Sequence, residues 1–173
     1  GKYRARVDLR LQQAEQALAT EMDPEQASET RELAGVVYAF RAMVPDPRVD
    51  ASPLLELAQA RLSEFSPGEA ARFPWLLVKG YACLALSQPV NAKTFLEEAL
   101  PMAQSEGLFF GMVEVNFHLA RLAYSQGRLS DALDICRKAQ EGIGTLMQSV
   151  GISLPALGCL DVAAGCVLIE RHA

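Results

Sequence analysis

The stretch of residues 109–144, FFGMVEVNFHLARLAYSQGRLSDALDICRKAQEGIG, constrains the fold of this chain more than any other. Apolar residues recur at steps of three and four on both sides of a short break, SQGR, at 125–128. Gly127 suits a helix C-terminus with positive φ, which glycine adopts without steric cost. The stretch therefore predicts a hairpin of two helices, the second beginning at or beside Ser130.

Small residues occur where the two helices of this hairpin must approach each other. Their spacings of seven, five and seven residues are also those of a tetratricopeptide unit, and the residues are Ala120, Gly127, Ala132 and Ala139. The same pattern occurs forty residues earlier, in Gly80, Ser87, Ala92 and Ala99. Partial copies follow downstream, with Gly165 and His172, and upstream, with Gly35 and Tyr38. The pattern predicts tandem helical hairpins with a period of about 40 to 45 residues.

We therefore expect an all-α fold, a right-handed superhelix (α-solenoid) of tetratricopeptide-like helical hairpins with about eight helices. Only 7% of the residues are aromatic, and no window alternates with period two, so we expect no sheet. A single domain over 1–173 would hold three hairpins, at about 25–65, 67–105 and 109–150, and two unpaired helices, at 3–19 and 153–171.

Prolines mark three helix boundaries in this scheme. Ser52 and Ser66 each precede a proline, so each is expected to cap a new helix, the first of which runs to Phe65. Pro101 is expected to kink the helix that begins near Val90 or to end it early.

The unpaired end helices suggest that both termini cut through a repeat, so we expect the chain to be a piece of a longer protein, with Gly1 a possible cloning remnant. The last helix is apolar nearly all round, and we expect another copy, or a neighbouring molecule, to cover it.

Several functions are disfavoured by composition. A net charge of −5, with no basic face, argues against binding of nucleic acid. The chain has no GxxxxGK[ST] loop for a nucleotide, no long apolar run and no leader peptide, so we expect a cytoplasmic protein without a cofactor. His118 and His172 are far apart in the repeat register, His118 at an outer position, so no catalytic or metal site is expected and the chain is not expected to be an enzyme.

The four cysteines contain no CxxC pair. Cys83 and Cys136 lie on apolar faces, whereas Cys159 and Cys166 are seven residues apart on one helix, roughly 10 Å, which is too far for a disulfide. We expect buried, reduced thiols, with a redox switch as the alternative.

Three segments, residues 10–18, 73–107 and 117–140, together resemble the TPR-like repeat region of large LuxR-type, MalT-like bacterial transcriptional regulators. The run HLARLAYSQGRLSDAL carries the resemblance most closely. In that family a nucleotide-binding module precedes the repeats and a helix-turn-helix follows them. The resemblance implies a ligand-sensing, protein-interaction and oligomerisation segment that has neither catalysis nor DNA binding of its own. Its partners would be a protein or a small-molecule effector on the concave face, and a second copy through the terminal helix, with no membrane.

Two alternatives stay open, a TPR scaffold that binds a peptide or protein in another signalling context, and a helical-bundle enzyme. In such solenoids the first helix of each hairpin lines the concave face. By the repeat register, the candidate binding residues there are Glu32, Tyr81, Glu114, Phe117, Arg121 and Tyr124. Their aromatic and charged groups suit a sugar, a small polar effector or a peptide. On the other interpretation, Tyr81 and Phe117 are packing residues, and Glu114 and Arg121 are solvated surface.

Overall fold

The computed structural model describes residues 9–10, 12–13, 16, 35–39, 50–149, 151 and 157–172. Within these residues all regular secondary structure is helical and no strand occurs, which confirms the expected all-α class. No helix in these ranges is long and apolar enough to cross a membrane. The chain divides into two compact units, Gly1–Phe95 and Leu96–Ala173.

Only parts of the first two predicted helices fall within the described residues. The described residues between 9 and 16 are helical, as predicted for the helix 3–19, and residues 35–39 are helical, as predicted for the hairpin that begins at about residue 25. The other residues of both predicted helices, and the boundary between them, lie outside the described part of the chain.

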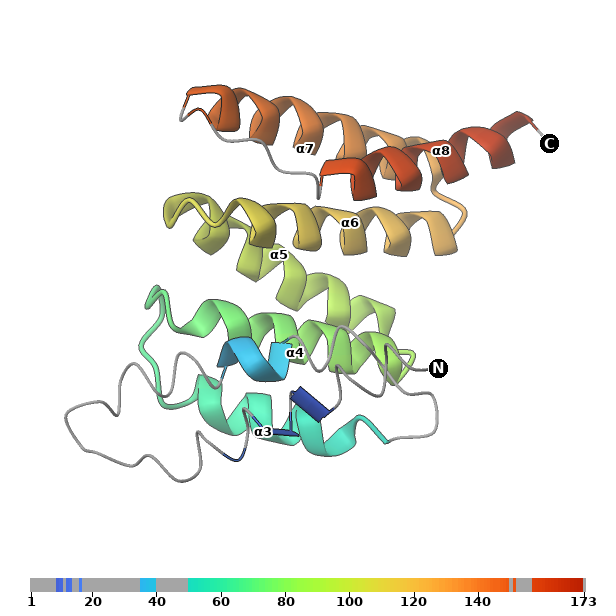
Figure 1. Ribbon diagram of the computed structural model, residues 1–173. Helices are drawn as coiled ribbons and strands as arrows, with labels where there is room; N and C mark the ends of the chain where they lie inside the picture. Colours follow the sequence, from blue (N-terminus) through green and yellow to red (C-terminus); the bar gives the residue numbers. More distant parts are fainter. Residues whose placement is uncertain are drawn as a thin grey trace. The chain divides into compact units, whose positions relative to one another are not determined.

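The first unit is built around α4 (Arg72–Ala85), which lies beside α3 (Ser52–Leu62) in Figure 1. Helix α4 is buried along most of its length, and Trp75 is only 1% exposed. Gly35 packs directly against this helix, because an added Cβ would lie 2.8 Å from Pro74 Cγ and 2.9 Å from Trp75 Nε1. The ring of Tyr38 also contacts Trp75, at a centroid distance of 5.7 Å. The predicted small position at Gly35 is therefore a point of close approach that only glycine fits.

The predicted caps at Ser52 and Ser66 are both wrong. Ser52 is the first residue of α3, and its N–H and hydroxyl both donate to Asp50 Oδ1, at 3.0 and 2.8 Å. Ser66 begins a turn, in which its N–H donates to Glu69 Oε1 at 2.8 Å, and α4 starts only at Arg72. Pro74 is the third residue of α4. The first four N–H groups of a helix have no partner within the helix, so the N–H that proline lacks is not missed at this position.

The ends of two helices also differ from prediction. Helix α3 ends at Leu62 rather than at Phe65. Helix α5 (Pro89–Ser105) continues through Pro101, so of the two predicted outcomes, a kink or an early end, the early end does not occur. Pro101 is on the exposed side, while Leu96, Ala99 and Ala103 on the other side are all 0% exposed. Burial of that side outweighs the loss of one backbone hydrogen bond.

The second unit contains the end of α5 and three longer helices, α6 (Phe109–Ser125), α7 (Leu129–Ser149) and α8 (Gly158–His172). Helices α6 and α7 run antiparallel as the predicted hairpin, and α8 packs against both (Figure 1). Ala123, Ala132 and Val167, one from each helix, meet in a buried cluster with Leu133. Small residues at this point let the three helices approach closely.

Three helix connections have the same backbone structure. The turn residue has a positive φ in each case, 57° at Ser87, 64° at Gly107 and 71° at Gly127. The next N–H donates to the carbonyl five residues back, in the pairs Gln88–Cys83 (2.8 Å), Leu108–Ala103 (2.8 Å) and Arg128–Ala123 (2.9 Å). This is the Schellman arrangement of a helix C-terminus. The two predicted turn positions are confirmed, and Gly107 adds a third one between them.

The residue after each turn also starts the next helix. Its carbonyl accepts the N–H four residues on, at 2.9–3.0 Å, in the pairs Ala92–Gln88, Met112–Leu108 and Ala132–Arg128. The predicted small contact residues near the turns are all buried: Gly80, Ala92, Ala99, Ala120, Ala132 and Ala139. The downstream copy differs, because an added Cβ at Gly165 would meet nothing within 4 Å. Gly165 is therefore not the helix contact that the pattern predicted.

Candidate functional site

Four of the six predicted binding residues lie along one face of α6, at steps of three, four and three: Glu114, Phe117, Arg121 and Tyr124. The first half of this helix is buried on all sides, from Gly111 to Val115. Exposure therefore rises along the row, from 8% at Glu114 to 36% at Tyr124. The row leads from the interior of the unit to its surface.

A carboxylate and an imidazole lie side by side at the buried end of this row. Glu114 Oε2 is 3.7 Å from His118 Nε2, one helical turn on, and both side chains are only 11% exposed. The prediction that His118 is at an outer position is therefore wrong, and so is the interpretation of Glu114 as solvated surface. The ring of Phe117 meets the imidazole edge to face, at a centroid distance of 5.3 Å and an angle of 78°. The i,i+4 spacing of acid and imidazole was the sequence signal for this pair.

The exposed half of the row offers a cation and a phenol. The guanidinium of Arg121 lies 5.6 Å from the ring centroid of Phe117, and in the described ranges it forms no ion pair. A guanidinium can bind a carboxylate or phosphate with two parallel hydrogen bonds. Phe117 itself is half-buried, so part of its ring supports the arginine and part remains accessible.

Tyr124 connects α6 to α8. Its hydroxyl donates to Glu170 Oε2 at 3.0 Å. This hydrogen bond, together with the negative charge of Glu170, raises the pKa of Tyr124 above its ordinary value, because both favour the protonated phenol. Helix α8 is thereby anchored at the exposed end of the row.

The other two predicted residues do not add to this face. Tyr81 is on α4 in the first unit and is 3% exposed, which agrees with its interpretation as a packing residue. Glu32 lies outside the described residues.

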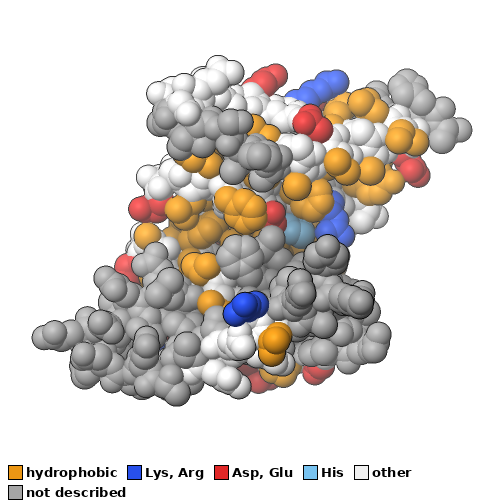
Figure 2. Space-filling view, viewed as in Figure 1, with side chains coloured by type: hydrophobic (Ala, Val, Ile, Leu, Met, Phe, Trp, Pro, Cys, Tyr) orange, Lys and Arg blue, Asp and Glu red, His pale blue; other side chains and the backbone are white. Residues whose placement is uncertain are grey.

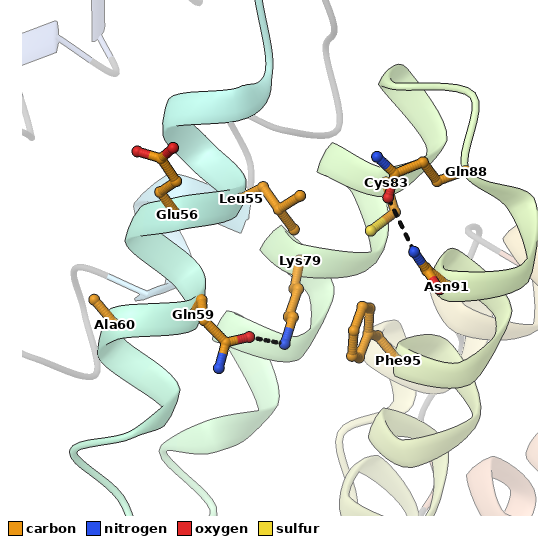
Figure 3. A pocket seen from close by; sticks show the side chains of 9 residues that line it. All are labelled: Leu55, Glu56, Gln59, Ala60, Lys79, Cys83, Gln88, Asn91 and Phe95. Carbon is orange, nitrogen blue, oxygen red and sulfur yellow. Dashed lines mark hydrogen bonds between the residues drawn. The ribbon is translucent and has the colours of Figure 1, made fainter.

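A second candidate site is an open groove of about 630 Å³ in the first unit (Figure 3). Lys79, on α4, donates a hydrogen bond to Gln59 Oε1 on α3 and lies 4.1 Å from the ring centroid of Phe95 on α5. Asn91 Nδ2 donates to Gln88 Oε1 at 3.0 Å. The groove is lined by nine residues: Leu55, Glu56, Gln59, Ala60, Lys79, Cys83, Gln88, Asn91 and Phe95. Each helix contributes lining residues that are four apart, but no single sequence pattern connects the three helices that form the groove.

The thiols and possible metal ligands complete the inventory. All four cysteines are free; Cys83 and Cys136 are buried as predicted, and burial raises the pKa of both thiols. Cys159 and Cys166 are exposed, contrary to the prediction, because they lie on the outer side of α8. Among the residues that the structure describes, no three His, Cys, Asp or Glu side chains gather as a metal site would require.

No known protein family, curated protein or solved structure gives a significant match to the chain. The functional argument therefore depends on the residues and geometry described above.

Proposed function

We propose that this chain is the effector-sensing, protein-interaction and oligomerisation segment of a cytoplasmic, LuxR-type, MalT-like transcriptional regulator, built as an α-solenoid of tetratricopeptide-like hairpins. The observation that supports it best is the repeated turn with positive φ at Ser87, Gly107 and Gly127, flanked by buried small residues. Turns with the same hydrogen bonds at a fixed interval are expected of a tandem helical repeat. In this proposal the chain is not an enzyme and carries no cofactor.

The α6 row is the effector site in this proposal. Arg121 supplies two parallel donors for a carboxylate or phosphate, and the partly exposed ring of Phe117 supplies an apolar face for a sugar ring or aliphatic group. Binding beside the buried Glu114–His118 pair would exclude water from one side of the ligand, which strengthens hydrogen bonds to it. These groups favour a small anionic or sugar-like effector over a purely apolar one.

A thermal-shift screen tests this site. Sugars, nucleotides and small organic acids are each added at millimolar concentration, and at least one class is expected to raise the melting temperature. A ligand at 100 times its Kd stabilises by about 2.7 kcal/mol. Arg121→Ala should abolish the shift, whereas Arg137→Ala, which removes an exposed arginine of α7, should retain it. The proposal fails if no class gives a shift, or if the shift survives Arg121→Ala.

The groove of the first unit favours a second candidate function, the binding of an extended peptide by a scaffold. The carboxamides of Gln59, Gln88 and Asn91 can bond to the backbone N–H and C=O groups of a peptide, and Lys79 can pair with a carboxylate (Figure 3). Fluorescence anisotropy with a library of labelled acidic peptides would detect this function. Lys79→Ala should then abolish binding while Arg121→Ala leaves it unchanged; the reverse pattern would favour the α6 site.

A further inference from the structure

The outer side of α8 carries a stripe of exposed residues at steps of three, four and three: Cys159, Val162, Cys166 and Ile169. Val162 is 66% exposed and Ile169 is 73% exposed, whereas Leu160 and Val167 on the opposite side are 0% and 2% exposed. Figure 2 shows hydrophobic side chains gathered over this helix in the upper part of the view. The spacing is that of the seam along which two helices pack.

We propose that a second copy of this chain covers the stripe, with the two α8 helices antiparallel about a two-fold axis near Ala164. This inference deepens the self-association part of the proposed function, on which it rests, and is independent of any effector on α6.

The order of residues in the stripe favours a symmetric, antiparallel pair. A 3-4-3 spacing reads the same in both directions, so a two-fold axis at its centre maps the stripe onto itself. Val162 then faces Cys166 of the partner subunit, and Ile169 faces Cys159 of the partner subunit. Each layer pairs a branched side chain with a small thiol, which fills the space evenly. A parallel pair would instead place branched side chains against each other and thiols against each other.

The backbone beside the stripe is open to close approach. An added Cβ at Gly158 or at Gly165 would meet nothing within 4 Å, so no part of the described chain fills the space next to either residue. On the outer side of α8, Gly165 is the small residue next to the axis, whereas Ala164 packs inward against the buried cluster of its own unit. Two helices can therefore approach closely where the proposed axis passes.

None of the four residues of the stripe is Asp, Glu, Lys or Arg. The two described carboxylates of α8 are held by their own chain, Asp161 by a hydrogen bond from Gln140 Nε2 at 2.5 Å and Glu170 by Tyr124 at 3.0 Å. Covering the four side chains of the stripe therefore requires no desolvation of a formal charge on any of them. One helical seam is smaller than the roughly 800 Å² per partner of a standard interface, so we expect a reversible dimer with a Kd weaker than about 1 µM.

Sedimentation equilibrium of the full chain under reducing conditions, from about 1 µM to several hundred micromolar, tests the proposal. The weight-average mass should rise with concentration from 18.8 kDa towards twice that value. Ile169→Glu should remain monomeric throughout, whereas Val90→Glu should behave like the wild-type chain. Val90 is also 73% exposed but is on α5, so it controls for the added charge. Circular dichroism should show both variants folded, because neither side chain is buried.

Two results would overturn the proposal. If the wild-type chain stays monomeric and a hydrophobic dye still binds at α8, the stripe is exposed in solution and a second copy does not cover it. A dimer that persists in Ile169→Glu would place the contact on another surface.

Thiol cross-linking tests the antiparallel direction with the chain's own cysteines. At a rise of 1.5 Å per residue, the proposed axis separates Cys159 from Cys166 of the partner subunit by about 4.5 Å along the helices, and the two copies of Cys159 by about 15 Å. A short bismaleimide should therefore link a mixture of Cys159→Ser and Cys166→Ser chains efficiently. Cys166→Ser chains alone should link poorly. Equal linking in both samples would contradict the antiparallel pairing.

Discussion

The turn residues Ser87 and Gly127 have the same hydrogen bonds but differ in side chain, so exchanging the side chains isolates the effect of a positive φ. Ser87 has φ 57° and Gly127 has φ 71°. An L-residue pays about 1–2 kcal/mol in the left-handed region, and glycine loses about 0.5–1 kcal/mol more backbone entropy on folding. Ser87→Gly should therefore raise the free energy of unfolding by about 0.5–1 kcal/mol, and Gly127→Ser should lower it by a similar amount.

The second substitution is free of steric effects, since an added Cβ at Gly127 would meet nothing within 4 Å. In a chain of this length, 1 kcal/mol corresponds to about 2–4 °C in melting temperature. Thermal unfolding followed by circular dichroism at 222 nm should therefore separate the two variants by several degrees, with the wild-type chain between them. Gly127→Ala is the matched control and should lose as much as Gly127→Ser, because the loss comes from φ and not from the hydroxyl. If Ser87→Gly is destabilising, or if Gly127→Ser is neutral, the positive φ does not limit these turns.

Three further predictions concern other contacts. Gly35→Ala should lower the free energy of unfolding by about 1–3 kcal/mol, because the new methyl group would overlap a buried ring. The control is Gly144→Ala, where an added Cβ meets nothing within 4 Å and the free energy of unfolding should rise by up to about 1 kcal/mol. Equal changes in the melting temperatures of the two variants would refute the close approach of Gly35 to α4. The hydrogen bond to Glu170 raises the pKa of Tyr124. This hydrogen bond therefore stabilises the fold below the ordinary tyrosine pKa, and the stabilisation is lost as the pH rises through the raised pKa of Tyr124. An absorbance titration should show one of the four tyrosines ionising late, and Glu170→Ala should remove this late step; an unchanged titration would exclude the bond. At low protein concentration a thiol reagent such as DTNB should modify the exposed Cys159 and Cys166 quickly, and the buried Cys83 and Cys136 only when the chain unfolds. A different division of the four cysteines would contradict this pattern of burial.

Local features of the fold were predictable from the sequence because their signals are local. The start of α6 at Phe109 and that of α7 at Leu129 follow from apolar spacing and from a turn glycine. Ser87 could be matched to Gly127 only through the small residues around it, since serine alone does not indicate a positive φ. Gly107 was not predicted as a third equivalent turn, because the repeat was sought at an interval of forty residues. Ser87 and Gly127 are forty residues apart, and Gly107 lies halfway between them.

The errors arose where tertiary contacts override local preference. Pro101 was expected to kink a helix or to end it early, and the early end does not occur because the buried side of α5 holds the helix together. The side chains at the candidate site were partly misplaced for a related reason. The repeat register assigned His118 an outer position, yet its side chain is only 11% exposed. Register gives the direction of a side chain; it does not say how many neighbours a helix has.

The shared turn also bears on how such a chain can change in length. All the backbone hydrogen bonds of each turn join residues at most five apart in sequence. The backbone structure of each turn is therefore determined by its own short segment. A recombination event that joins Ser87 directly to Arg128 would remove two helices and still leave a complete turn at the junction. Such chains can therefore gain or lose whole helical pairs in one genetic step, and their lengths would be expected to differ by multiples of one repeat rather than by single residues.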